Sequence, residues 1–229
     1  MSADDLGQLR NRCEALLRLH SEDAQLGKAL SGLYYAFKSL KFVPPRTDEL
    51  LGGDYEEVCV KSSRADEACY LAEMMIRSLH PVGDLLAQVV NICVLDSRHG
   101  RSSLSLKTVL KDPALDPSVR GTLVAIRGSH GFDYIAEFTN ASKHREFVDR
   151  LVLHDDNHQR IEFQPFERRN GKSERKREFT EVLNYGNALR QHADSALKLL
   201  VDRRKPLATM PLVPAPFRGS ITGTVSLDH

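Results

Sequence analysis

The chain has 229 residues, of which 41% are hydrophobic and 28% charged, and its formal net charge is +1. This length suits one domain with a substantial core, and the composition excludes a chain that is disordered throughout. The balanced charge excludes a global electrostatic attraction to nucleic acid or to a membrane, so any such attraction must be local.

The cysteines and the N-terminus predict a reduced protein in the cytoplasm. Cys13, Cys59, Cys69 and Cys93 are scattered without a C-x-x-C pair, which argues against structural zinc and a redox dithiol. No nucleotide-binding glycine motif is present, and we expect no cofactor and no metal. The acidic start lacks the pattern of a signal peptide, and the longest apolar stretch, residues 85–95, is too short to span a bilayer. We therefore expect a cytoplasmic protein without membrane contact.

Apolar residues at helical spacing predict helices over most of the chain. Ser21 is expected to cap the second helix, which should stop before Pro44-Pro45 because a helix interior needs the N–H that proline lacks. Gly52-Gly53 marks a further break. The expected helices cover residues 6–19, the segment from Ser21 to Pro44, and residues 64–79, 82–95, 104–111, 117–127, 132–145 and 178–204.

A β-hairpin is predicted between the last two helices. Residues 147–153 and 160–166 have the β-branched and aromatic content of strands, with a turn at Asp155-Asp156-Asn157. Because an isolated hairpin is only marginally stable, this one should lie against the helices.

The sequence therefore predicts a mainly α fold, a helical bundle with a small appended β-hairpin. Residues 1–205 form a single helical domain, with the hairpin at about 147–166 inserted before the last long helix. Residues 206–229 are a Pro-rich C-terminal tail, either disordered or docked.

The helix that follows His80 carries a polar stripe without any Lys, Glu or Arg. His80, Asp84, Gln88 and Asn91 fall within roughly one quarter of the helix circumference, and apolar residues fill most of the rest. This pattern predicts a helix that is buried nearly all round, with its polar stripe paired to another helix. The alternative is that the stripe is the wet side of an amphipathic helix.

The helix expected over residues 132–145 offers a matching polar face. If the two helices pack antiparallel, this face meets the polar stripe, and we expect His80 or Asp84 to bond Asn140, Lys143 or His144 directly or through a water. The resulting network is either structural or a site for acid–base chemistry or anion binding. The residues on this face are Asp133, Glu137, Asn140, Lys143 and His144.

The segment Phe138-Thr139-Asn140-Ala141-Ser142-Lys143-His144-Arg145 resembles the Arg-Asn-x-x-x-His signature of HEPN-like proteins. The resemblance implies a prokaryotic helical bundle of a stress or defence system, a toxin–antitoxin pair for example, that dimerises to bring two motifs together over RNA. It also implies metal-independent ribonuclease activity, with Asn140 and His144 matching the signature residue by residue. Lys143 is the third catalytic candidate, as a nearby cation, although a Lys is a point charge and not a bidentate fork. Thr139 stands where the signature has Arg. The alternative to a ribonuclease is therefore a degenerate relative that binds RNA without cleaving it.

One segment, residues 168–177, concentrates positive charge. Several Lys and Arg side chains together attract phosphates strongly at low salt, although no aromatic residue within the segment offers base stacking. The alternative is a solvated loop. The candidate nucleic-acid contacts are Arg168, Arg169, Lys172, Arg175, Lys176 and Arg177.

Two further functional classes stay open beside the RNA-directed one. The first is a non-catalytic protein-interaction module in which the polar stripe merely fixes how the helices pack. The second is a bundle enzyme that uses His80 and Asp84, although the Glu-x-x-His pairs of di-iron bundles are missing. The surroundings of His99 and His130 match no motif. The possible partners are therefore RNA, a second copy of the chain, or a protein such as an antitoxin.

Overall fold

The computed structural model describes residues 3–21, 23–52, 58–144, 148, 150–155 and 158–203, without the side chains at 3, 4, 58–63, 101, 144, 151, 154, 155 and 158. Its helices are α1 (Ala3–Leu19), α2 (Ala24–Leu51), α3 (Val58–Leu79), α4 (Val82–Cys93), the 3-10 turn η1 (Arg101–Ser103), α5 (Leu106–Lys111), α6 (Pro117–Gly128), α7 (His130–His144) and α8 (Phe179–Arg203). Its strands are β1 (Arg150–Asp155), β2 (His158–Phe163), β3 (Phe166–Glu167), β4 (Ser173–Glu174) and β5 (Arg177–Glu178).

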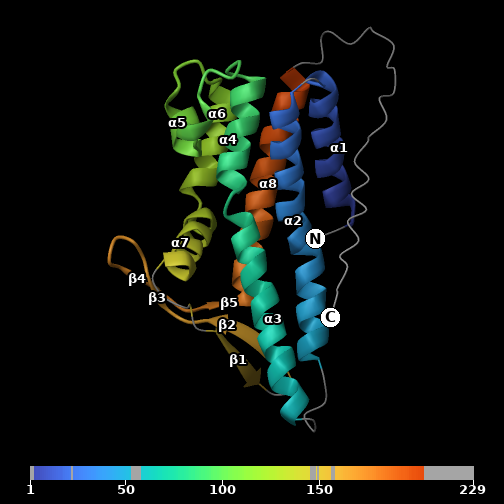
Figure 1. Ribbon diagram of the computed structural model, residues 1–229, viewed down its shortest axis with the longest axis vertical. Helices are drawn as coiled ribbons and strands as arrows, with labels where there is room; N and C mark the ends of the chain where they lie inside the picture. The colour runs from blue at the N-terminus through green and yellow to red at the C-terminus, as the bar shows by residue number, and fades with distance from the viewer. Residues whose placement is uncertain are drawn as a thin grey trace, which may run out of the picture.

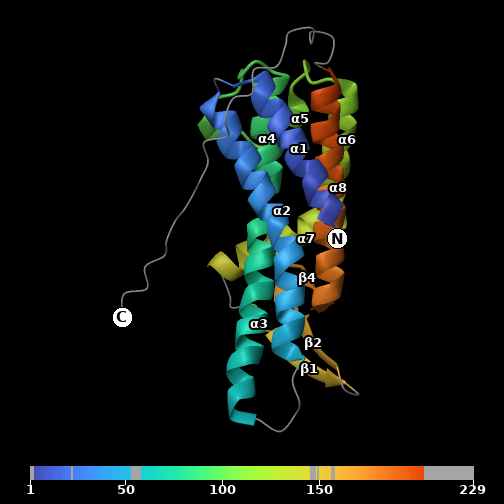
Figure 2. The same cartoon turned by 90° about the vertical axis from the view of Figure 1, so that its right-hand side faces the viewer.

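The helices form an elongated bundle around α2 and α8 (Figures 1 and 2). α2 packs against α1, α3, α4 and α8, while α8 also packs against α1, α6 and α7. One contiguous core of Leu, Ile, Val, Ala and Phe side chains runs between these helices. In the described part of the chain, no helix is both long and apolar enough to cross a membrane. The mainly α fold with a small appended β-hairpin is confirmed, and the tail at 206–229 lies outside the described residues.

The second helix differs from the prediction at both ends. Asp23, and not Ser21, caps it, because its Oδ1 accepts hydrogen bonds from the backbone N–H groups of Gln25 and Leu26 at 2.8 and 3.0 Å. At the other end, α2 runs on through Pro44-Pro45 to Leu51. Packing overrides the missing prolyl N–H groups here, because Leu50 and Leu51 are buried beyond the prolines and the helix still reaches the core.

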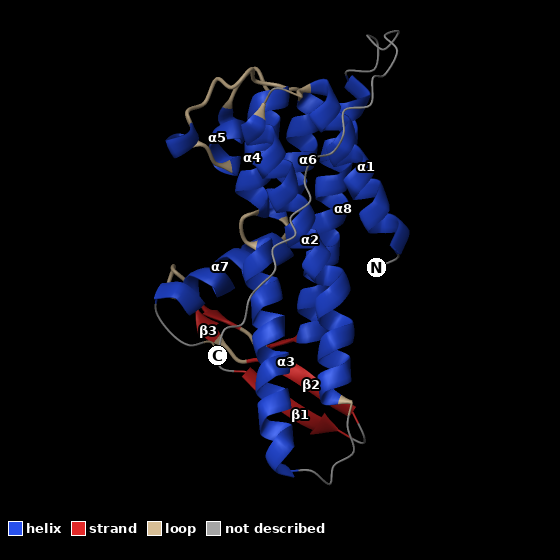
Figure 3. Cartoon of the chain, turned by 45° about the vertical axis from the view of Figure 1, so that its right-hand side comes forward, coloured by secondary structure: helices blue, strands red, loops and turns tan. Residues whose placement is uncertain are grey.

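The β-hairpin is present and antiparallel, with Arg150 opposite Phe163 and Asp155 opposite His158. The residues between the strands, Asp156 and Asn157, lie outside the described part of the chain. The segment expected to be a basic loop contributes more structure than predicted: β5 joins β2 as a third strand, and β3 pairs with β4 as a separate ribbon. Figure 3 shows the strands gathered at one end of the bundle.

Aromatic side chains dock the strands on α7. The ring of Phe138 lies 5.3 Å from that of Phe163 and 5.8 Å from that of Phe166, in edge-to-face arrangements. Arg150 of β1 forms an ion pair with Glu73 of α3, which ties the other side of the sheet to the bundle. As expected for a small sheet, its stability comes from the helices beneath it.

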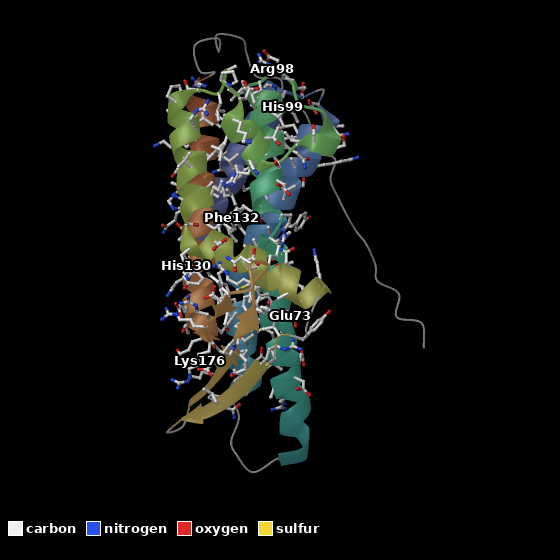
Figure 4. All side chains as sticks on the ribbon, turned by 90° about the vertical axis from the view of Figure 1, so that its left-hand side faces the viewer. Glu73, Arg98, His99, His130, Phe132 and Lys176 are labelled. Carbon is white, nitrogen blue, oxygen red and sulfur yellow. The ribbon has the colours of Figure 1, made fainter. Side chains whose placement is uncertain are left out.

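Two close approaches fix the start of α7. A Cβ atom at Gly83 of α4 would lie 2.7 Å from Phe132, and one at Gly131 would lie 2.6 Å from the Cβ of Tyr185 on α8. Figure 4 shows Phe132 at the level where α7 meets α4. Any larger residue at either glycine would push α7 away, so the course of α7 depends on them.

Candidate nucleic-acid interface

The motif on α7 uses its polar side chains within its own helix. Thr139 is fully buried, and its hydroxyl donates to the Ile135 carbonyl at 2.8 Å. The Asn140 amide donates to the Ala136 carbonyl at 2.7 Å. Lys143 is exposed one turn further on, and the side chain of His144 lies outside the described residues. The position where the signature has Arg therefore faces the core.

The polar stripe of α4 does not form the buried seam that was predicted. Asp84 is exposed, while His80 and Gln88 are half-buried. Asn91 is buried, but its amide bonds both backbone groups of His99, in the loop after α4, at 3.0 and 3.1 Å. Among the described residues, no hydrogen bond joins the stripe to α7. The α2 and α5 helices cover the flanks of α4 and leave the middle of the stripe facing solvent.

The first part of the basic segment lies on α7. Arg168 forms an ion pair with Asp133, and the backbone N–H of Arg169 donates to the Glu137 carboxylate at 3.0 Å. Sequence reasoning placed these two acids on the polar face of α7 but not under the basic segment. Two sets of candidates, the motif and the basic segment, are thus brought to the same helix.

The second part of the basic segment is neutralised within the chain. Arg175 pairs with Glu181 at 3.1 Å, and Lys176 with Glu162 at 3.1 Å. Arg177 is 3% exposed, which removes it from contact with any partner. In the described part of the chain, the side chains of Lys143, Arg169 and Lys172 have no carboxylate partner, and all three are exposed.

Three segments contribute to one region, which we name the cationic corner: the cations are Lys143 from the end of α7 and Arg169 from the β3–β4 loop, and both act on the imidazole of His80 in the α3–α4 turn. The pKa of His80 is lowered first by burial and then by the charge of Lys143, with a further contribution from Arg169. Asp84 opposes this shift. Because these charges act together on His80, the corner attracts an anion.

A second polar group, the Arg177 cluster, was not predicted from the sequence. The Arg177 guanidinium donates to Nε2 of His130 at 2.6 Å, pairs with Glu174 at 3.1 Å and forms an ion pair with Glu181. It also lies 5.7 Å from the ring centroid of Tyr185, whose hydroxyl donates to Glu181 at 2.7 Å. Burial and that hydrogen bond raise the pKa of Tyr185 to about 12. The cluster clamps the last strand to α7 and α8.

The described residues contain no group of three or more His, Cys, Asp or Glu side chains that could hold a metal ion. Cys13, Cys69 and Cys93 are free and buried, and the side chain of Cys59 lies outside the description. Comparison of the chain with protein-family models, with curated proteins and with solved structures found no match.

Proposed function

We propose that this protein binds the phosphate backbone of RNA at the cationic corner and does not cleave it. The observation that carries the proposal is that Lys143 and Arg169, both exposed and without a carboxylate partner in the described chain, act on the same imidazole, that of His80. Salt-sensitive phosphate contacts by Lys and Arg are the common basis of sequence-independent RNA affinity. Under this proposal the chain is a degenerate HEPN-like relative from a prokaryotic stress or defence system.

The same geometry argues against cleavage. Cleavage requires a cation or hydrogen-bond donor directed at the charge that develops in the transition state. Position 139, where the signature has its Arg, is fully buried, so its side chain cannot reach bound RNA. Asn140 is bonded to its own helix. We therefore expect labelled RNA to stay intact with the purified protein, with or without a chelator. Cleavage that survives the chelator and is lost in His144→Ala would contradict the non-cleaving form of the proposal.

RNA affinity of a charge-neutralised variant tests the binding site. In Lys143→Gln/Arg169→Gln, the affinity for a short single-stranded RNA should fall roughly 10-fold at low salt, because two phosphate contacts are lost. The control is Arg127→Gln/Lys198→Gln on α6 and α8, which removes the same charge from two other exposed positions. Fluorescence anisotropy gives both constants. An equal loss in the two variants would place binding elsewhere or make it non-specific.

A second candidate function, a protein-interaction module, is favoured by exposed apolar side chains on α2 and α3. The hydroxyls of Ser39 on α2 and Ser78 on α3 bond at 2.9 Å, which places these two residues opposite each other. Phe42 lies one turn from Ser39, and Met74 lies one turn from Ser78, so Phe42 and Met74 flank this contact on the same side of the helix pair. We name the set the apolar face; its members are 43–57% exposed, and they are Tyr35, Phe42, Tyr70 and Met74.

Self-association tests this second candidate. If the apolar face binds a second copy of the chain, sedimentation velocity should show a concentration-dependent dimer that is lost in Phe42→Glu/Met74→Glu. Val124→Glu is the control, because Val124 is 53% exposed on α6, away from this face. A monomer at every concentration would remove the homodimer form of the candidate.

A further inference from the structure

A small hollow lies at the end of the bundle opposite the sheet. It has a volume of about 160 Å³ and is lined by the start of α2, the C-terminal half of α4 and the loop after α4. Sites for drug-sized ligands hold roughly 300–1,000 Å³, so this hollow admits only a small group. Figure 4 shows His99, one of its lining residues, far from Lys176 near the sheet.

The loop that closes the hollow is held in a strained conformation. Asp96 and Ser97 both have positive φ angles, 49° and 57°, which non-glycine residues adopt at a cost. The backbone N–H of Ser97 donates to the Asn91 carbonyl at 2.8 Å, and the Asn91 side chain bonds both backbone groups of His99. Buried Asn91 thus fixes the wall of the hollow. The sequence had instead predicted that Asn91 pairs with a neighbouring helix.

The His99 ring is oriented by a buried carboxylate. Its Nε2 lies 2.8 Å from Oδ2 of Asp112, whose side chain is 3% exposed. The backbone N–H of Ala114 lowers the pKa of Asp112, and the hydrogen bond with His99 adds to the shift, so the carboxylate stays ionised. An ionised carboxylate can only accept, so Nε2 of His99 donates the proton of this hydrogen bond.

The remaining lining combines amides with apolar side chains. Gln25 and Gln88 each offer a donor and an acceptor, and in the described chain neither side-chain amide has a partner. Ile92 and Leu104 supply apolar surface. Glutamine amides read the edges of bases, and unstacked RNA bases are held by ring stacking together with such edge contacts.

From this lining we infer that the hollow is a subsite for one unstacked nucleobase, with Gln25 and Gln88 contacting its edge and His99 its ring. The inference rests on the proposed RNA binding and extends it. Gln88 lies on α4 eight positions after His80, which is in the turn before that helix, so at the helical rise the two are roughly 12 Å apart. A single strand with a phosphate at the cationic corner therefore reaches the hollow within a few nucleotides, at about 3.4 Å or more each.

Free nucleosides test the subsite. Adenosine, guanosine, cytidine and uridine are titrated into the ¹⁵N-labelled full chain up to about 10 mM, above the millimolar affinity expected of so small a ligand. At least one should give saturable shifts centred on the Gln88 amide and His99. Gln88→Ala, and separately Gln25→Ala, should weaken that binding about 10-fold. Gln191→Ala, an exposed glutamine on α8, should not change it.

Two results would overturn the subsite: no saturable shift with any of the four nucleosides, or shifts that survive both glutamine variants. Because nucleosides carry no phosphate, their binding does not depend on the cationic corner. RNA binding without nucleoside binding therefore removes the subsite alone. Nucleoside binding without RNA binding keeps the subsite and removes the proposed function on which its place in an RNA site rests.

Discussion

The cationic corner and the Arg177 cluster contain residues of the same short basic segment, yet the two regions are opposite in electrostatic character. At the Arg177 cluster, Glu174 and Glu181 neutralise a guanidinium that is 3% exposed. At the corner, the side chains of Arg169 and Lys143 are exposed, Asp84 opposes their effect on His80, and Glu137 bonds only the backbone of Arg169.

The difference shows that a run of Lys and Arg is not in itself a charged surface. Arg169 and Arg177 are only eight positions apart in the sequence, but the acids around them come from α7, β4 and α8. A buried ion pair contributes mainly to how the strand is held. An exposed unpaired cation adds little to stability and is free to meet a phosphate. Substitutions in the Arg177 cluster should therefore change the stability of the protein, and substitutions in the cationic corner should change its affinity for RNA.

The largest expected effect is on stability at the Arg177 cluster. Arg177→Met should lower the free energy of unfolding by about 1–3 kcal/mol, because it removes the closer of the two cations that pair with the buried carboxylate of Glu174 and leaves only Arg168, at 3.4 Å. The matched control is Arg175→Met, since Arg175 pairs with the same Glu181 but is 71% exposed. Its effect should stay below about 1 kcal/mol. Urea unfolding followed by circular dichroism measures both; equal losses would show that burial does not separate them.

A smaller effect is expected on RNA affinity when the anchor of Arg169 is removed. Glu137 accepts the backbone N–H of Arg169, so Glu137→Ala should release the loop from the corner and weaken RNA binding roughly 3-fold, equivalent to less than 1 kcal/mol. Removal of a negative charge near RNA would otherwise strengthen binding. The control is Glu167→Ala, an exposed acid at the start of the same loop. A gain in affinity in Glu137→Ala would show that the anchor does not matter.

The smallest effect concerns the protonation of His80. Since burial and Lys143 lower its pKa, Lys143→Gln should raise that pKa, and bound RNA should raise it as well by supplying negative charge. Both are measured by NMR titration of the imidazole. An unchanged His80 pKa in both experiments would show that His80 is not part of the cationic corner.

The lowered pKa also sets the direction of the pH dependence of stability. The unfolded chain binds a proton at His80 more readily than the folded chain, so this contribution is complete above the ordinary histidine pKa of about 6.5 and is lost as pH falls below it. In Lys143→Gln the loss should be smaller. RNA affinity should change in the opposite direction and increase as His80 becomes protonated.

The sequence was sufficient for most of the fold because its apolar spacing is strongly periodic, as in α4 and α8. It failed at Pro44-Pro45, where packing of later residues carries the helix onward. The site was harder to predict because hydrogen-bond partners come from distant segments. Asn91 was recognised as a polar residue in an apolar helix, but nothing local indicates that its partner is the backbone of His99.

The same limit applies to the basic segment. Its ten residues predict a uniform positive patch, whereas the structure divides it according to acids up to 35 residues away in sequence, as for Arg168 and Asp133. Thr139 illustrates the converse. Thr139 precedes Asn140 and so occupies the position of the Arg in the HEPN-like signature, but in α7 its side chain faces the core.

The central claim, that Lys143 and Arg169 neutralise RNA phosphates, is tested most directly by the salt dependence of RNA affinity. A plot of log affinity against log salt concentration loses about 0.7 of slope for each single-strand phosphate contact removed. We expect the slope of Lys143→Gln/Arg169→Gln to be shallower than that of the unaltered protein by roughly 1.4, and that of Arg127→Gln/Lys198→Gln to be unchanged. Identical slopes for all three proteins would contradict the account.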